Sequence, residues 1–230
     1  MTDETPKSAL RKMLEDNKSF SEELPPGQLD SIQYEQNPYI TVLTCCDSRV
    51  RIRAFLADPH PTDNVFVIRN VGNQLAVTSG SVDYGVRHLK TPLLLILGHT
   101  RCGAIKAAST DYRKLSLHLV QELNGLHIPV RGMDPGTDDD VQWLQAVERN
   151  VHYQMDLAVQ RYAPEIAEGT LAVIGCVYDF ANLYKKGIGK TVLLNVNGES
   201  NSDVFTKSDL MDDLPADLVD SVLPGSPVPQ

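Results

Sequence analysis

The chain has 230 residues, of which 42% are hydrophobic and 22% are charged, and its formal net charge is -9. This is enough material for one substantial core, whereas the acidic balance argues against nucleic acid or an anionic membrane as the main partner, because either would require a clustered basic surface. The first 20 residues lack the apolar core of a signal peptide and the longest apolar run, "PLLLILG", is too short to span a bilayer, so we expect a cytoplasmic protein.

Short apolar runs alternate with helical patterns along the chain. Five runs are β-branched or leucine-rich and nearly continuous, as is typical of strands buried on both faces. They cover residues 39–44, 64–69, 92–98, 170–179 and 191–197. Between them, residues 75–90 and 140–163 carry apolar side chains at helical spacing and act as crossovers. The alternation predicts an α/β fold with a central, mainly parallel sheet of four to five strands flanked by helices.

The two ends of the chain fall outside this alternation. A helix is expected from about Pro6 to Phe20, and the sequence offers no packing partner for it within its own subunit. We therefore expect residues 1–35 to form a helical arm that packs on a neighbouring subunit. Residues 36–200 would form the α/β domain, and residues 201–230 a Pro-rich, partly mobile C-terminal extension.

Metal-binding residue types follow two of the predicted strands. Cys45 comes directly after residues 39–44, and His99 and Cys102 follow residues 92–98. In an open parallel sheet, ligands gather outside the carboxyl ends of the strands, so these two segments can converge. Two thiolates and one imidazole suit zinc, and three protein ligands leave a fourth position for water or substrate. The pattern therefore favours a catalytic zinc site over a structural one.

The remaining cysteines and histidines have simpler interpretations. A single Cys-x-Asp or His-x-x-Cys pattern is common by chance, and a free cysteine is more often a small buried hydrophobe. Cys46 should point to the opposite side of the strand end and Cys176 lies within an apolar strand, so both are predicted to be core thiols. Surface or core roles are predicted for the histidines without a partner at ligand spacing: His60, His88, His118, His127 and His152.

Four segments of the chain together resemble the β-class carbonic anhydrase family: "CCDSRV", "VIRNVGN", "VDYGVRHLKTPLLLILGHTRCGAIKAA" and "LAVIGCVYD". The similarity extends from about Gln36 to Gly198, and Cys-x-Asp-x-Arg followed some fifty residues later by His-x-x-Cys is highly specific. The resemblance implies one Zn²⁺ per subunit, held by Cys45, His99 and Cys102. It also implies a carbonate dehydratase, which hydrates carbon dioxide reversibly to bicarbonate and a proton by a zinc-bound hydroxide.

The resemblance further implies that Asp47 and Arg49 form a hydrogen-bonded dyad beside the metal. A physical argument supports such a dyad independently, because two thiolate ligands weaken zinc as a Lewis acid and leave its water less acidic. Asp47 can accept a hydrogen bond from that water and orient it toward the substrate. A bidentate Arg49 would keep the carboxylate ionised and fixed.

The substrate pocket implied by the resemblance consists of Gln36, Phe66 and Tyr84. Gln36 would offer an amide donor to bicarbonate, and the two aromatic side chains would form a narrow apolar wall for an uncharged, linear molecule. Family members with a closed zinc site tend to have Trp and Gly three and one residues before the first Cys. Val42 and Thr44 occupy those positions here, which favours the open site.

Gly103 completes the expected pocket, since a glycine at a helix start permits close backbone approach and leaves an N–H to meet an anion. In the family, N-terminal helices lie across a neighbouring subunit, so a homodimer or a dimer of dimers with a shared active site is expected. Two alternatives stay open. One is a hydrolase of carbonyl sulfide or carbon disulfide, and the other is a non-catalytic bicarbonate-binding protein in which Asp47 closes the zinc shell.

Overall fold

The computed structural model describes residues 5–27, 29–54 and 64–224. The chain divides into two compact units, Met1–Gln36 and Asn37–Gln230. The first unit contains α1 (Pro6–Glu23), which begins with a capping box between Thr5 and Ser8, followed by a 3₁₀ turn (Asp30–Ile32). Within the described residues, α1 has no buried side chain.

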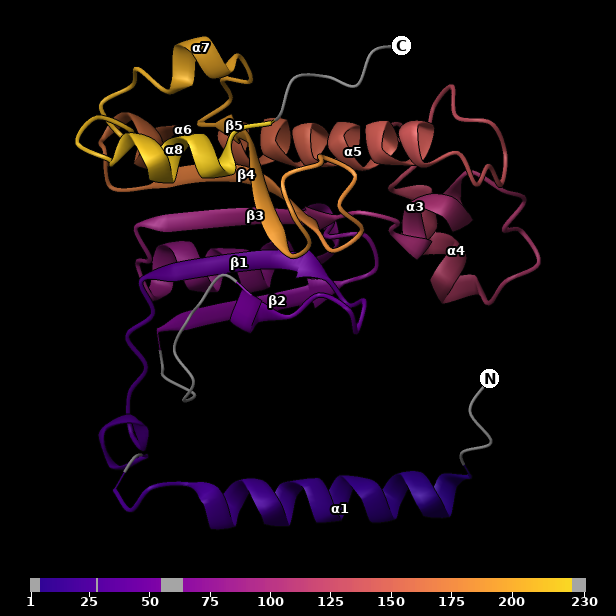
Figure 1. The fold of residues 1–230 in the computed structure, drawn as a ribbon, viewed down its shortest axis with the longest axis vertical. Coiled ribbons are helices and arrows are strands. Elements are labelled where there is room, and N and C mark those ends of the chain that lie inside the picture. Colours follow the sequence, from indigo (N-terminus) through magenta and orange to yellow (C-terminus); the bar gives the residue numbers. More distant parts are fainter. Residues whose placement is uncertain (1–4, 28, 55–63, 225–230) are drawn as a thin grey trace. The chain divides into compact units, whose positions relative to one another are not determined.

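The second unit is built on a five-stranded sheet (Figure 1). Its strands are β1 (Ile40–Cys45), β2 (Val65–Asn70), β3 (Leu93–His99), β4 (Ala172–Asp179) and β5 (Lys190–Val196). The order across the sheet is β2-β1-β3-β4-β5, in which the first four strands are parallel and β5 is antiparallel to β4. The predicted mainly parallel sheet is therefore confirmed, with strand boundaries displaced by one or two residues.

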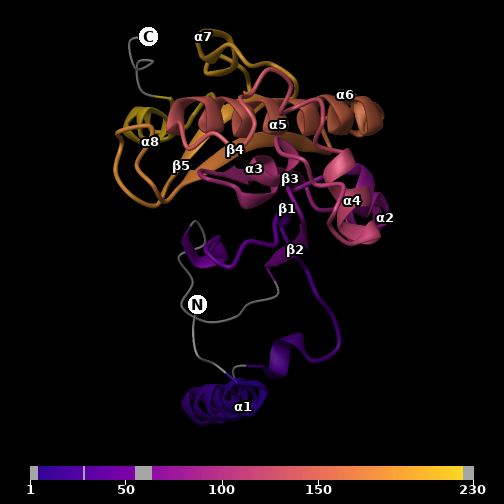
Figure 2. The same cartoon turned by 90° about the vertical axis from the view of Figure 1, so that its right-hand side faces the viewer.

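Helices cover both faces of this sheet. They are α2 (Ser79–Asp83), α3 (Gly103–Ala108), α4 (Leu117–Asn124), α5 (Asp140–Arg161), α6 (Ala163–Ala167), α7 (Ser202–Phe205) and α8 (Ala216–Val222). Figure 2 shows α5 running along the sheet, where it packs on β3 and β4. Because side chains alternate along a strand, Leu94 and Ile96 join the core under α5, whereas Leu95 and Leu97 join the core on the other face with α7 and α8.

The helix expected at residues 75–90 is divided into three parts. A 3₁₀ turn (Ala76–Thr78) leads into α2, and a π-helical turn (Tyr84–His88) follows. Gly85 lies so close to β1 that an added Cβ would overlap the side chain of Thr41. The predicted helical crossover is therefore confirmed over residues 76–88, and its last turn is π-helical where the chain makes this close contact.

The C-terminal segment packs on the hydrophobic core of the sheet face that also carries α7. The apolar cluster that contains Phe205 and Met211 is contacted there by Val219 and Val222 of α8 and by Leu223, which follows α8. Residues 225–230 lie outside the described residues, so the predicted mobility of the extension stays a prediction. Among the described helices, none combines the length and apolar character required to cross a membrane. The cytoplasmic location likewise stays a prediction.

Two glycines allow α5 to approach the sheet closely. A Cβ at Gly98 would lie 2.7 Å from Val151 Cγ2 and 3.2 Å from Val147 Cγ1. A Cβ at Gly175, on the neighbouring strand, would lie 2.8 Å from Met155 Cγ. Since Gly98 directly precedes His99, this contact also sets the depth at which the end of β3 lies beneath α5.

We expect Gly98→Ala to lower the free energy of unfolding by about 1–3 kcal/mol, because the methyl group would overpack the interface with α5. Gly80→Ala is the matched control, since no heavy atom lies within 4 Å of its added Cβ. That change should leave stability unchanged or slightly raised, because alanine has the higher helix propensity. Urea unfolding of both variants tests this, and equal midpoints would contradict the close packing.

Candidate metal centre

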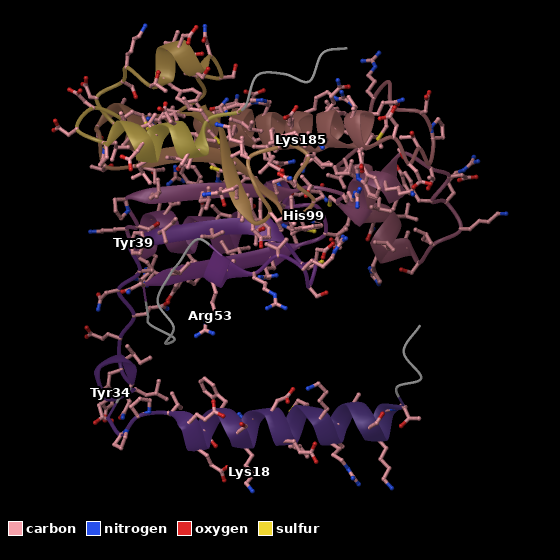
Figure 3. The ribbon with its side chains drawn as sticks, in the orientation of Figure 1. Lys18, Tyr34, Tyr39, Arg53, His99 and Lys185 are labelled. Carbon is pink, nitrogen blue, oxygen red and sulfur yellow. The ribbon has the colours of Figure 1, made fainter. Side chains whose placement is uncertain are left out.

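Three ligand-type side chains converge at the carboxyl edge of the sheet. Cys45 ends β1, His99 ends β3 and Cys102 is the N-cap residue of α3. Their ligand atoms all lie within 4.8 Å of one another, and the two Sγ atoms are 4.0 Å apart. Figure 3 shows His99 where the central strands end. The structure thus brings together the three residues that the sequence predicts as ligands.

The orientation of His99 fits a metal ligand. Its side chain is fully buried, and Nδ1 donates a hydrogen bond to the carbonyl oxygen of Thr100 at 2.9 Å. A carbonyl only accepts, so Nδ1 carries the proton and Nε2 presents a lone pair. In the described part of the chain, this buried Nε2 has no hydrogen-bond partner. A metal ion beside the two thiols would satisfy it, in the arrangement usual for metal-binding histidines.

The two buried thiols form one hydrogen bond with each other. The hydrogen bond with Cys102, together with His99, lowers the pKa of Cys45 to about 4 against the opposing effect of burial. The same hydrogen bond and burial raise the pKa of Cys102, although the N–H groups of Ile105 and Ala104 oppose the rise. A cation bound between the sulfur atoms would favour the thiolate form of both, because metal binding releases thiol protons.

Asp47 and Arg49 form the predicted dyad. Asp47 Oδ1 accepts from the backbone N–H and Nε of Arg49, both at 2.9 Å, and Oδ2 accepts from Nη2 at 2.6 Å. The Arg49 side chain is the main reason that the pKa of Asp47 is lowered to about 2. Asp47 Oδ2 also lies 3.8 Å from His99 Nε2. An ionised carboxylate is therefore held beside the ligand cluster.

Arginine side chains fix the two turns that carry these residues. Arg69 donates to the carbonyl oxygens of Cys45, Asp47 and Val50 at 3.5, 3.4 and 2.8 Å, so it holds the turn after β1. The turn after β3 is fixed through Arg101, which has a φ of 51°. Its guanidinium makes two hydrogen bonds to Asp140 at 2.8 and 2.7 Å, and its carbonyl oxygen accepts from Arg49 at 3.2 Å.

Phe180 belongs to the site but was not predicted from the sequence. Its ring stacks on the His99 imidazole, with centroids 5.6 Å apart and an interplanar angle of 28°. The Arg49 guanidinium carbon lies 4.7 Å from the same ring centroid, at cation–π distance. The available signal was its position directly after the predicted strand 170–179, at the edge where parallel strands end.

Phe66 and Tyr84 contact one another away from the metal centre of the same chain. Their ring centroids are 5.7 Å apart, with an interplanar angle of 32°. In the register of β1 with β2, Phe66 pairs with Thr41, whereas Asn70 pairs with Cys45. Phe66 therefore lies about 13 Å back along the strand from the ligand edge, at about 3.3 Å per residue. A role for this pair in the site would need a second copy of the chain.

The other residues singled out from the sequence have varied positions. Gly103 begins α3 next to Cys102, with open space around its Cα, whereas Gln36 belongs to the first unit and its pocket role stays a prediction. Cys176 is buried as predicted, and burial raises its pKa to about 12. The prediction of a buried Cys46 was wrong, because β1 ends at the preceding residue and this thiol is exposed. His60 lies outside the described residues.

The fold and the cluster define an α/β protein with a mainly parallel sheet and a Cys-His-Cys site at the carboxyl edge of the parallel strands. A family model described as carbonic anhydrase matches residues 40–184. The chain belongs to this family, in its β class, and by family it is a carbonate dehydratase.

Comparisons with individual proteins agree with this assignment. Carbonic anhydrase 2 of Mycobacterium tuberculosis (strain ATCC 25618 / H37Rv) is 26% identical over 215 residues, which cover 89% of this chain and 100% of that protein. The carbonic anhydrase of Mycolicibacterium smegmatis is 29% identical over 195 residues, covering 79% and 93%. Among solved structures, a tetrameric β-carbonic anhydrase from Sordaria macrospora has a TM-score of 0.68 at 22% identity, covering 81% and 97%, which supports the fold.

We expect Cys102→Ser to weaken cobalt(II) binding at least about 100-fold, because it removes one of three ligands. Cys46→Ser is the control, since this neighbouring thiol is exposed and outside the cluster. Titration of metal-free protein with cobalt(II), followed through the sulfur-to-metal absorption band, measures both affinities. Equal affinity in the two variants would exclude Cys102 as a ligand.

Proposed function

We propose that this protein catalyses the zinc-dependent, reversible hydration of carbon dioxide to bicarbonate and a proton, with one Zn²⁺ per chain held by Cys45, His99 and Cys102. The observation that carries the proposal is the buried His99 Nε2 without a partner among the described residues, beside two thiols. Two sulfur ligands and one nitrogen ligand suit zinc and leave its fourth position open. When bound, the ion supplies Lewis acidity that brings the pKa of a coordinated water toward neutrality.

Asp47 would hold and orient that water. Its Oδ2 faces the cluster and keeps lone-pair capacity beyond the one hydrogen bond that it accepts from Arg49. Arg49 makes protonation of the carboxylate costly and fixes its plane through two parallel contacts. The same ion pair supports the open form of the site, because it occupies the carboxylate that would otherwise be available to complete the metal shell.

Phe180 would limit access of bulk water to this centre. Its ring covers one side of the His99 imidazole and lies under the Arg49 guanidinium. Carbon dioxide is uncharged and weakly hydrated, so an apolar wall beside a fixed hydrogen-bond acceptor favours its approach. Once a second subunit is present, the apolar wall would be extended by Phe66 and Tyr84. Hydrogen-bond donors to bicarbonate would come from the Gln36 amide and the Gly103 backbone N–H.

We expect Asp47→Asn to lower the hydration rate by about 100- to 10,000-fold while zinc content is retained, because the acceptor is lost and the metal ligands remain. Stopped-flow hydration and metal analysis measure the two quantities. A variant with near-native rate would show that Asp47 does not act in the reaction.

The chain contains a matched control for this change. Arg113 donates to Asp111 through its backbone N–H, Nε and Nη2 at 3.2, 2.8 and 2.8 Å, which is the same pattern as in the dyad. Asp111 is outside the ligand cluster. Asp111→Asn should therefore break an equivalent ion pair and leave both rate and zinc content unchanged.

We further propose that the active unit is a homodimer or a dimer of dimers in which two chains share each site. Leu10, Met13 and Leu14 of α1 are 55%, 54% and 56% exposed and fall on one side of the helix at spacings of three and four. An uncovered apolar stripe of this kind requires a partner in water. The tetrameric state of the Sordaria macrospora relative is consistent with this proposal.

We expect Leu14→Glu to shift the assembly toward smaller species in light scattering, because it places a charge within the apolar stripe. Ser19→Glu introduces the same charge on the opposite side of α1 and should leave the mass unchanged. If native protein has the mass of a single chain and is fully active at low concentration, the shared site is excluded.

A further inference from the structure

The first turn of α5 contacts the turn that carries the ligand Cys102. Trp143 Nε1 donates a hydrogen bond to the carbonyl oxygen of Cys102 at 3.0 Å. Asp140, three residues earlier on the same helix, accepts the two hydrogen bonds from the Arg101 guanidinium. Residues three apart in a helix lie on the same face. One face of α5 therefore holds both residues of this turn.

The Cys102 carbonyl accepts a second hydrogen bond from its own helix. The backbone N–H of Lys106 in α3 donates to it at 3.1 Å, so both lone pairs of this oxygen are used. The Trp143 ring is itself fixed, because Lys106 Nζ lies 5.0 Å from its centroid, at cation–π distance, and its other atoms pack against the main core. The indole N–H thus meets the carbonyl from a rigid support.

Hydrogen bonds hold both peptide units that flank the Cα of Cys102. The unit before it contains the Arg101 carbonyl, which accepts from Arg49 Nη2 at 3.2 Å. The unit after it contains the Cys102 carbonyl, and the φ and ψ between the two units are -65° and 118°. Peptide units are planar, so fixing both of them fixes the direction of the Cα–Cβ bond. The sulfur position then depends on one side-chain dihedral angle.

Helix α3 has little capacity to fix its own first residue. Cys102 is the N-cap of α3, and its side chain makes no capping hydrogen bond. A serine, threonine or aspartate at this position would accept from the first N–H groups of the helix, whereas a metal-binding thiolate is committed elsewhere. Because α3 has only 6 residues, it is too short to be stable without tertiary contacts. The donor from α5 supplies such a contact at the ligand itself.

We propose that Trp143 is a positioning residue for the metal ligand Cys102. Its indole N–H holds the Cys102 carbonyl, and through that peptide unit it keeps the sulfur at the ligand edge of the sheet. Residues that support a metal ligand typically account for a 10- to 100-fold difference in metal affinity. We expect the lower end of this range, because the helical hydrogen bond from Lys106 remains. The inference rests on the metal centre of the proposed function.

The test uses the full-length chain and cobalt(II) as the probe. Trp143→Phe removes the indole N–H and keeps an aromatic ring at the same place. It should weaken cobalt(II) binding by about 10-fold and shift the sulfur-to-metal absorption band, because the Cys102 sulfur is held less firmly.

A second measurement changes the donor atom alone. Trp143 is the one tryptophan of the chain, so growth of a tryptophan-requiring host on benzothienylalanine replaces this side chain and no other. In that analogue a sulfur atom takes the place of the indole N–H. We expect the same loss of affinity and the same spectral shift as in Trp143→Phe. Protein labelled with fluorotryptophan, which retains the N–H, should bind cobalt(II) as the native protein does.

Tyr162→Phe is the matched control for Trp143→Phe. Tyr162 follows the other end of α5, about 28 Å away at 1.5 Å per residue, and its hydroxyl donates to Asp83 Oδ1 at 2.8 Å. This change also removes an aromatic donor and keeps the ring. It should lower the unfolding midpoint and leave the cobalt(II) affinity and spectrum unchanged.

The possible results separate the two proposals. Native cobalt(II) affinity and spectrum in the benzothienylalanine protein would show that the indole N–H does not position Cys102, whatever the phenylalanine variant does, and would overturn the inference. If the phenylalanine variant does not fold, the analogue decides. Absence of a sulfur-to-metal band in the native protein would overturn the metal centre itself, and with it the proposed function.

Discussion

The metal centre depends on the parallel pairing of β1 with β3. Thr44 pairs with Leu97, so the ends of the two strands lie side by side and deliver Cys45 next to His99. Cys45 and Cys102 are 57 residues apart in the chain, yet their sulfur atoms meet because parallel strands end at the same edge. An antiparallel arrangement of the same two strands would put these side chains on opposite edges.

Strand ends determine where the ligands lie, whereas neighbouring elements determine how they are aimed. Arg69 on β2 holds the turn that carries Asp47, and α5 holds the turn of Cys102. Each contact ends on a backbone carbonyl, so it acts on the direction of a peptide unit and not on a ligand side chain. Such supports can reduce the motion of the ligands without occupying space in the site.

Much of this arrangement was predictable from local patterns. Apolar runs defined the strands, and residue types at their ends defined the three ligands. The support from α5 was not predictable, because Trp143 becomes a neighbour of the Cys102 turn only through the close approach of α5 over Gly98 and Gly175. The exposed Cys46 was missed for a related reason, since one residue decides whether a side chain follows strand alternation or the turn beyond.

The two Asp-x-Arg pairs separate local from tertiary contributions to the site. Asp47 with Arg49 and Asp111 with Arg113 show the same three hydrogen bonds, and in both cases the arginine lowers the aspartate pKa to about 2. The ion pair is therefore a property of the short sequence, and a shifted pKa alone would mark both sites equally. What distinguishes Asp47 is its surroundings, because only a fold that places His99 3.8 Å away turns this common pair into part of a metal centre.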